Sequence, residues 1–334
     1  MSSLARGSRS FALVLAGSLS LAAAVAFAQQ GPIAAMFSDD QQRDASLAAS
    51  FTVVDLPAPS AAGSPLKVYL SAGDMERAFD RAPFRPDAAI VPTNTELQIT
   101  AASPATQRVL IDRVQKQPEV LRGLQSQIEA RRKQPSPATG AESGLLRIGI
   151  DSFVAQLSAR GTPSPGAFPK SACLIATDFP NGGAVDRREL FAQDRVRQGV
   201  AACLDALDGS GVQSLVLPLM GASSSKVQAN DAMLEGQRTL RECRLINSTA
   251  GIALGIHDFA GRRHNLRDIG VIQWDQEIAS MFKVPADSRA ARSAQLAYRS
   301  YADQVQNALR KGLAGQKTSS SDVNGSCRTI LDVK

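Results

Sequence analysis

Residues 214–226 read SLVLPLMGASSSK, a short apolar run that is followed by glycine and three serines. A Val- and Leu-rich run of this length, bounded by turn residues, predicts a strand buried on both faces in a parallel sheet. In open α/β sheets the loop after such a strand lies at the carboxyl edge, where ligands bind. Glycine lets backbone N–H groups approach an anion, and serine hydroxyls add donors. The stretch therefore predicts either a ligand loop or an ordinary tight connection to a helix.

The segments before this run alternate between strand and helix patterns. A helical pattern over residues 186–207 links the run to a predicted strand at 172–176. This order is typical of a right-handed parallel crossover. Earlier strands are predicted at 66–70 and 87–92, the second ending at a proline that removes a ladder donor. A weaker strand pattern occupies residues 51–54.

Helical spacing dominates the rest of the chain. Apolar residues recur at helix spacing after residue 104, and Pro118 is expected to divide this pattern into two helices. Beyond the central run we predict a helix at 229–246 and another at 248–259, capped by Ser248 and weakened by two glycines. The later segments predicted are a strand at 269–274 and helices at 275–282 and 286–311.

Residues 1–28 have the pattern of a secretory signal peptide. Arg6 and Arg9 precede an apolar segment, and Ala26-Phe27-Ala28 fits a cleavage site of the small-x-small type. We therefore predict cleavage after Ala28 and a periplasmic or secreted bacterial protein. The alternative is an uncleaved anchor, because the apolar segment is marginally long enough to span a bilayer. No other segment reaches that length, so no membrane contact is expected after cleavage.

The charge of the chain favours small anionic partners over nucleic acid. Cleavage removes two arginines and no acidic residue, which lowers the formal net charge from +6 to +4. A mildly basic chain can attract anionic small molecules or surfaces. Its basic residues are not interleaved with aromatic ones, so no nucleic-acid partner is expected. The densest basic cluster, residues 131–133, is interpreted as a solvated helix end.

The four cysteines, Cys173, Cys203, Cys243 and Cys327, are widely spaced and include no Cys-x-x-Cys pair. This spacing fits no zinc site, and neither a metal nor a cofactor is expected. In an oxidising compartment one or two disulfides can form. Cys173 and Cys203 lie in apolar patterns, so buried free thiols and a disulfide both remain open for them.

Three segments resemble the macro domain, a family whose members bind ADP-ribose or related nucleotides. Residues 68–75 end in Gly73-Asp74-Met75, where the family has Gly-Asp-Ile. Residues 87–94, DAAIVPTN, are similar to the family's Asp-Ala-Ile-Val-Asn-Ala-Ala-Asn and match it at Asp87, Ala88 and Asn94. Residues 212–225 resemble a strand with the pattern Ile-x-x-Pro-x-x-Gly-x-Gly, matching at Pro218 and Gly221.

The resemblance implies a three-layer α/β/α fold with a mixed, largely parallel sheet and a C-terminal helical extension. It covers roughly residues 66–282, after the signal peptide and an extended lead-in at 29–65. The helical extension is then expected at 283–314, and a flexible tail at 315–334.

The resemblance also implies a site for a small nucleotide such as ADP-ribose. Asp74 would accept from the adenine amino group, with the Met75 N–H beside it, and Asn94 would bond the distal ribose. Trp274 would lie against the adenine, or else serve as an amphipathic core residue. The diphosphate would be wrapped by the loop after the central strand, with Lys226 adding charge; its residues are Pro218, Gly221, Ala222, Ser223, Ser224, Ser225 and Lys226.

Departures from the family pattern leave several functions open. Residues 95–100 contain no glycine where the family has a Gly-rich loop that grips phosphate, Val91 replaces an asparagine, and Ser223 replaces a glycine. A nucleotide or ADP-ribose-type binder is the first hypothesis, and a structural or interaction protein with a degenerate fold and an undefined partner is the second. The third is a hydrolase of an ADP-ribose-like substrate, with Glu96 or Asp178 as acid or base.

No catalytic residue can be assigned to the hydrolase hypothesis from the sequence. The two histidines, His257 and His264, have no Gly-x-Ser-x-Gly elbow to partner them. A nucleophile and its base must meet in space, which spacing along the chain does not report.

Overall fold

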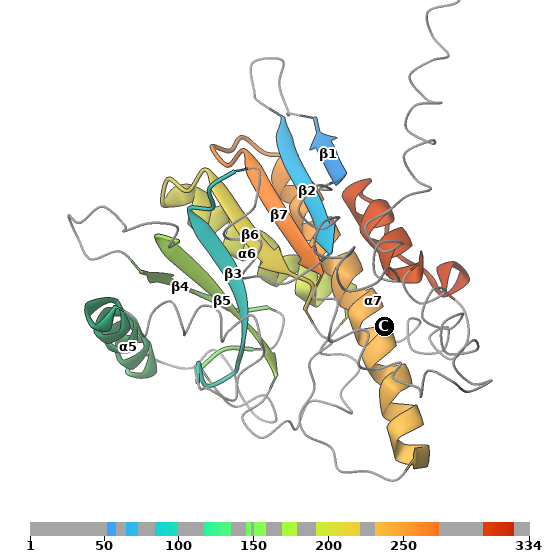
Figure 1. The fold of residues 1–334 in the computed structure, drawn as a ribbon, viewed down its shortest axis with the longest axis horizontal. Helices are drawn as coiled ribbons and strands as arrows, with labels where there is room; N and C mark the ends of the chain where they lie inside the picture. The colour runs from blue at the N-terminus through green and yellow to red at the C-terminus, as the bar shows by residue number, and fades with distance from the viewer. Residues whose placement is uncertain are drawn as a thin grey trace, which may run out of the picture.

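The computed structural model describes residues 52–57, 65–72, 84–98, 117–134, 145–147, 150–157, 169–178, 192–220, 231–273 and 303–323. Seven strands form one sheet in the order β1-β2-β7-β6-β3-β5-β4 (Figure 1). The strands are β1 (Thr52–Leu56), β2 (Leu66–Ala72), β3 (Ala88–Asn94), β4 (Ser152–Gln156), β5 (Ser171–Asp178), β6 (Ser214–Pro218) and β7 (Asp268–Gln273). The helices are α5 (Pro118–Arg132), α6 (Gln193–Gly209) and α7 (Asp231–Ala260), the short 3-10 turn η5 (Ser320–Asp322) and a C-terminal helix described at 303–313.

The sheet is mixed and largely parallel, as the sequence predicts. The five strands β2, β7, β6, β3 and β5 run parallel, and the outer strands β1 and β4 pair antiparallel with their neighbours. The central run forms β6, whose five residues are all buried. β3 continues two residues beyond Pro92, because one proline removes a single donor and the pairing with β5 persists to Asn94.

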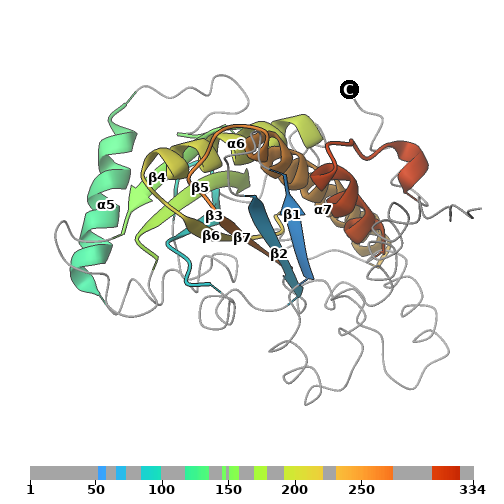
Figure 2. The ribbon, with the colours of Figure 1, turned by 90° about the horizontal axis from the view of Figure 1, so that it is seen from above.

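Helices cover both faces of the sheet, which gives three layers. Alternate residues of each strand point to opposite faces, and they divide between two hydrophobic clusters. One cluster joins Ile90, Cys173 and Leu217 to α6, α7 and the C-terminal helix. The other joins Val91 and Leu174 to α5. Figure 2 shows α6 and α7 together on one side of the sheet, with α5 near β4.

One continuous helix, α7, replaces the two helices predicted at 229–246 and 248–259. The predicted cap Ser248 lies inside the helix with 1% of its surface exposed. Gly251 and Gly255, the two glycines that lowered the predicted helix propensity, allow α7 to pack close to α6. A Cβ atom at Gly251 would lie 2.7 Å from the Gln193 carbonyl oxygen, and one at Gly255 would lie 2.9 Å from that of Arg197. The division into two helices was therefore wrong, because close packing favours glycine here.

The C-terminal helix packs against another side of α7. A Cβ atom at Gly312 would overlap the Cβ of Ala253, and Leu309 and Leu313 are buried in the same cluster as α6 and α7. Residues 243–256 of α7 are buried throughout. This part of the helix is buried although it includes the polar residues Asn247, Ser248 and Thr249, and its apolar residues pack with the sheet, α6 and the C-terminal helix in one cluster.

The chain after this helix makes defined contacts as far as Val323, although its composition predicts a flexible tail. Gln193 of α6 binds the backbone of Thr318 twice, donating to its carbonyl at 2.7 Å and accepting from its N–H at 3.1 Å. Asp322 accepts from the Ser319 N–H at 2.8 Å and pairs with Lys311. The Lys311 hydrogen bond, followed by that from Ser319, lowers the pKa of the Asp322 carboxyl.

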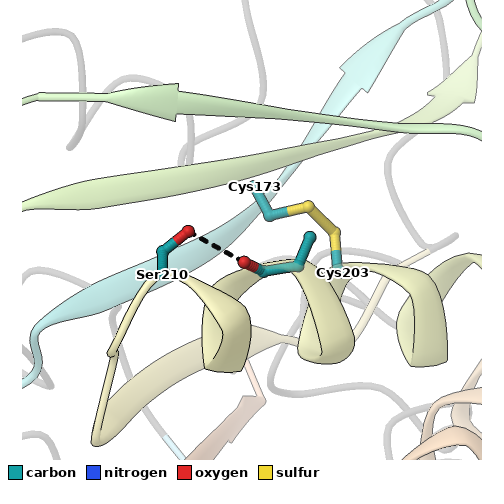
Figure 3. The surroundings of a disulfide bond; sticks show 4 residues. Cys173, Cys203 and Ser210 are labelled. Atoms are coloured by element: carbon teal, nitrogen blue, oxygen red, sulfur yellow. Dashed lines mark hydrogen bonds between the residues drawn. A yellow bond between two sulfur atoms is a disulfide. The ribbon is translucent and has the colours of Figure 1, made fainter.

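A disulfide joins β5 to α6 and settles one alternative left open by the sequence. Cys173 and Cys203 are bonded, with their Cα atoms 5.9 Å apart (Figure 3). Both are fully buried. Further along α6, the Ser210 hydroxyl donates to the Ala206 carbonyl at 2.9 Å at the end of the helix (Figure 3). Cys243 of α7 is disulfide-bonded as well.

The outer strand β4 is bound by a side chain of α5. The Gln127 amide donates to the carbonyl of Gln156 at 2.9 Å and accepts from its N–H at 2.9 Å. Pro118 begins α5, since its missing N–H costs nothing there. The helix predicted before Pro118 lies outside the described residues. Among the helices of the described residues, none is long and apolar enough to cross a membrane.

Candidate functional site

Five parallel strands end at one edge of the sheet. In order across the sheet, β2, β7, β6, β3 and β5 end at Ala72, Gln273, Pro218, Asn94 and Asp178. The segments that leave these ends are the natural place for a ligand in an α/β fold. β2 and β3 are three interstrand spacings apart, which amounts to roughly 14 Å.

Of the residues predicted to bind a ligand, Asn94 and Pro218 lie in the described part of the chain. Asp74, Met75, the loop Gly221–Lys226 and Trp274 lie outside it. Their strands are described, however, and the chain limits how far they can be from the strand ends. Asp74 is two residues beyond the end of β2, Trp274 is one residue beyond β7, and Gly221 is three residues beyond β6.

Pro218 is buried at the end of β6, opposite Ile272 of β7. The next residue continues this pairing, since the Leu219 N–H donates to the Ile272 carbonyl at 2.9 Å. On its other side β6 pairs with β3. Among the described residues this pairing is limited to Leu215 with Ala88 and Val216 with Ala89. Prolines in both strands remove ladder donors, and the ends of β6 and β3 are not paired to each other.

Asn94 closes a turn at the end of β3. Its side-chain Oδ1 accepts from the N–H of Glu96 at 3.1 Å and from that of Gln98 at 2.9 Å. Its Nδ2 donates to Oε1 of Gln98 at 3.1 Å, and its own carbonyl accepts from the Leu97 N–H at 3.0 Å. Such self-bonding by asparagine is a common way to fix a turn. The sequence predicts Asn94 as a ligand residue but does not reveal this turn.

The turn is attached to the core by Leu97 and Thr95. Leu97 is 1% exposed and has a φ of 54°, in the left-handed region that a leucine rarely adopts. The Thr95 carbonyl accepts from the N–H groups of Leu145 and Leu146 at 2.8 and 3.1 Å. These contacts hold the backbone of the turn from both sides.

Two threonines beside Asn94 were not singled out from the sequence. The hydroxyls of Thr93 and Thr95 are buried and have no hydrogen-bond partner among the residues that the structure describes. A threonine near a strand end is ordinary, so no sequence signal distinguishes this pair.

Glu96 and Asp178, the acidic residues of the hydrolase hypothesis, lie in the chain at or just after the carboxyl ends of β3 and β5. Asp178 is the register partner of Asn94 across a β-bulge, and Glu96 is a partly buried residue of the turn. The histidines serve other contacts. His257 Nδ1 lies 3.0 Å from the Leu313 carbonyl, and His264 Nδ1 lies 2.7 Å from that of Leu266, before β7 begins. In the described part of the chain, no three His, Cys, Asp or Glu residues are grouped to hold a metal.

A perturbed tyrosine lies toward the opposite edge. The Tyr69 hydroxyl donates to Asp268, the first residue of β7, at 3.0 Å. Burial, then this hydrogen bond and the charge of Asp268, raise the pKa of Tyr69 to about 12. The phenol acts as a hydrogen-bond donor that joins β2 to the start of β7.

Solved macrodomain structures are similar to this chain, with low scores. The macrodomain of Oceanobacillus iheyensis with MES bound has 10% sequence identity, and the match covers 78% of this chain and 100% of that one with a TM-score of 0.40. The same macrodomain with ADP has 11% sequence identity, and the match covers 79% of this chain and 100% of that one with a TM-score of 0.34. A variant of it with ADPR has 9% identity, and the match covers 78% and 100% with a TM-score of 0.35. No family model and no curated protein matches the chain. At such low TM-scores the similarities carry no argument about this protein.

Proposed function

We propose that this chain is an exported macro-like domain that binds a nucleotide or ADP-ribose-type ligand at the carboxyl edge of its sheet. The observation that supports the proposal most directly is the order of four neighbouring strands, β2, β7, β6 and β3. The residues that the macro-domain resemblance names are the last residues of these strands or follow them in the chain, which supports a ligand site along this edge.

The order of the strands matches the order of chemical groups in such a ligand. Asp74 and Met75 after β2, with Trp274 after β7, would take the adenine at one end. Gly221 to Lys226 after β6 would hold the diphosphate in the middle. Asn94, the last residue of β3, would take the ribose. An amide nitrogen carries two hydrogens, and Gln98 accepts one of them in the structure, so the other is the proposed contact to a sugar hydroxyl.

Export is part of the proposal. The leader-like pattern of residues 1–28 supports it, and so does the buried bond between Cys173 and Cys203. Disulfides persist in oxidising compartments such as the periplasm. We expect the protein purified from its native cells to begin at Gln29. Intact mass measurement tests this, and a full-length mass would contradict cleavage.

Titration calorimetry of the chain from Gln29 onward tests the ligand. We expect heat with ADP-ribose and ADP, and none with ribose 5-phosphate, because that compound lacks adenine; NAD serves as a further comparison. Replacing Asp74 by alanine removes a charged acceptor, so Asp74→Ala should weaken ADP-ribose binding by about tenfold or more. Gly221→Val should weaken it by crowding the phosphate loop.

Asp55→Ala is the matched control for the carboxylate. Asp55 is exposed on β1 and pairs in register with Lys67, near the start of β2, so it lies away from the carboxyl edge. Its removal should leave the affinity unchanged. Equal affinities of Asp74→Ala and the parent protein would remove the adenine role from Asp74.

A scaffold that keeps the fold without the ligand is the second candidate. The closed turn at Asn94 favours it, because that turn uses its backbone donors internally. Absence of heat with every nucleotide would support the scaffold. The hydrolase hypothesis remains a sequence prediction, to be pursued once binding is found.

A further inference from the structure

The last described segment of the chain, residues 315–323, is attached to the first turn of α6, and we call it the C-terminal clasp. The Gln193 side chain binds both backbone groups of Thr318, donating to the carbonyl at 2.7 Å and accepting from the N–H at 3.1 Å. Beside this contact, the Lys317 ammonium group pairs with the carboxylate of Asp194 at 2.7 Å. Two successive residues of the clasp are thus bonded to two successive residues of α6.

The same glutamine places the clasp beside the middle of α7. The Gln193 Nε2 that donates to the Thr318 carbonyl also lies 3.4 Å from Oδ1 of Asn247. Cys243 is four residues before Asn247 on this helix, about 6 Å along its axis. Residues four apart lie on the same face of a helix. The clasp therefore passes close to the face of α7 that carries Cys243.

Cys243 is fully buried and disulfide-bonded, and the sequence leaves one candidate for its partner. Cys173 and Cys203 are bonded to each other. The one remaining cysteine of the chain is Cys327, which lies outside the described residues and nine positions after Thr318. Nine extended residues span up to about 30 Å. This length is sufficient to bring the two Cα atoms to the roughly 5.5 Å that a disulfide needs.

We infer that Cys243 and Cys327 form a second disulfide, which fastens the C-terminal clasp to α7. Each thiol gives up one proton and one electron when the bond forms. A disulfide-containing oxidant accepts them by thiol–disulfide exchange and leaves as two thiols, and a dithiol reductant reverses the reaction. Reduction leaves the clasp attached by its hydrogen bonds and ion pairs. The bond does not depend on the proposed nucleotide site.

Peptide mapping without reduction tests the bond. The protein is purified from an oxidising compartment, treated with iodoacetamide and digested with trypsin. Cleavage after lysine and arginine places Cys243 in peptide 242–244 and Cys327 in peptide 318–328. We expect the mass of these two peptides joined by a disulfide. After treatment with dithiothreitol, the two separate thiol peptides should replace it.

The bond between Cys173 and Cys203 is the internal control, since it joins peptides 171–187 and 198–226 of the same digest. Detection of the control pair without the expected pair would overturn the inference. An alkylated cysteine in either expected peptide would contradict it as well. So would finding the expected pair only in a band of twice the chain mass on a gel run without reductant, because the bond would then join two molecules.

Amide hydrogen exchange tests the clasp itself. Cys327→Ser removes the bond and leaves α7 unchanged in sequence. The Thr318 N–H should then exchange at least about tenfold faster, because the clasp opens more often without its covalent link. Ser326→Ala, at the neighbouring position, is the matched control and should leave this exchange unchanged, as should the β5 amides in both variants. Equal exchange at Thr318 in Cys327→Ser and the parent protein would overturn the clasp.

Discussion

The helices on the two faces of the sheet are attached in different ways. On one face α7 meets α6 at Gly251 and Gly255 and meets the C-terminal helix at Gly312, with almost no space between the backbones. A disulfide adds a covalent bond between α6 and β5. On the other face α5 packs through Val120, Leu124 and Ile128. Its one glycine, Gly123, has no atom within 4 Å of where a Cβ would lie.

The difference shows where the fold is least able to move. In the chain, the proposed phosphate loop lies between β6, which is buried in the sheet, and α7, whose later turns pack against α6. The α5 face contains the turn at Asn94, which is held by hydrogen bonds and by Leu97 instead. The α6–α7 face is thus held by close helix packing, and the end of β3 by a self-contained turn.

Charging the interface of the C-terminal helix should have the largest effect. Leu309 and Leu313 are 7% and 4% exposed and belong to the cluster beneath α7. The double variant Leu309→Asp with Leu313→Asp buries two unpaired carboxylates. It should therefore lose about 5 kcal/mol or more of unfolding free energy, measured by urea titration followed by circular dichroism. Arg310→Asp, on the exposed side, should stay within about 0.5 kcal/mol of the parent.

Removing the disulfide should have the next largest effect. The double variant Cys173→Ala with Cys203→Ala releases a link between residues 30 positions apart. Chain entropy alone predicts a loss of about 3 to 4 kcal/mol. Equilibrium unfolding without reductant measures it. A change below about 1 kcal/mol would mean that packing, not the bond, holds α6 on the sheet.

The smallest effects are expected from two glycine-to-alanine variants, one in a helix on each face of the sheet. Gly251→Ala places a methyl group 2.7 Å from the Gln193 carbonyl, so α6 and α7 must separate, at a cost of about 2 kcal/mol. Gly123→Ala adds a methyl group in open space and should stabilise the protein by about 1 kcal/mol through helix propensity. Thermal unfolding of both variants gives opposite shifts from the parent. Shifts of the same sign would contradict the proposed difference between the faces.

Most strands could be predicted from local patterns, but β4 and the continuous helix α7 could not. Apolar runs bounded by turn residues located β6 and β5 correctly, since a strand buried on both faces needs such a run. Ser248, Gly251 and Gly255 have the local preferences of a cap and of helix breakers. In the structure the glycines allow close packing against α6, and this contact with a distant segment overrides local propensity.

The sequence predicts which edge of the sheet carries the candidate site, but not the hydrogen bonds that its residues make. The resemblance matches Asp87, yet this residue lies at the amino edge, where it bonds to Ser214 and pairs with Lys170 at 2.9 Å. Asn94 lies at the carboxyl edge as expected, but its bonds to Glu96 and Gln98 depend on the turn geometry. The bond between Cys173 and Cys203 was undecidable for a similar reason, because spacing in the chain does not give the separation in space.

The contact between Gln127 and β4 has a consequence for the protein in a crowded solution. β4 is the outermost strand on its side, and an outermost strand invites pairing with a strand of another molecule. The Gln127 amide occupies both backbone groups of Gln156 in the way that an added strand would. Because β4 has only five residues, few of its backbone N–H and carbonyl groups remain available to pair with a strand of another molecule. The Gln127 side chain thus occupies a position on this edge of the sheet that the backbone of an added strand would need.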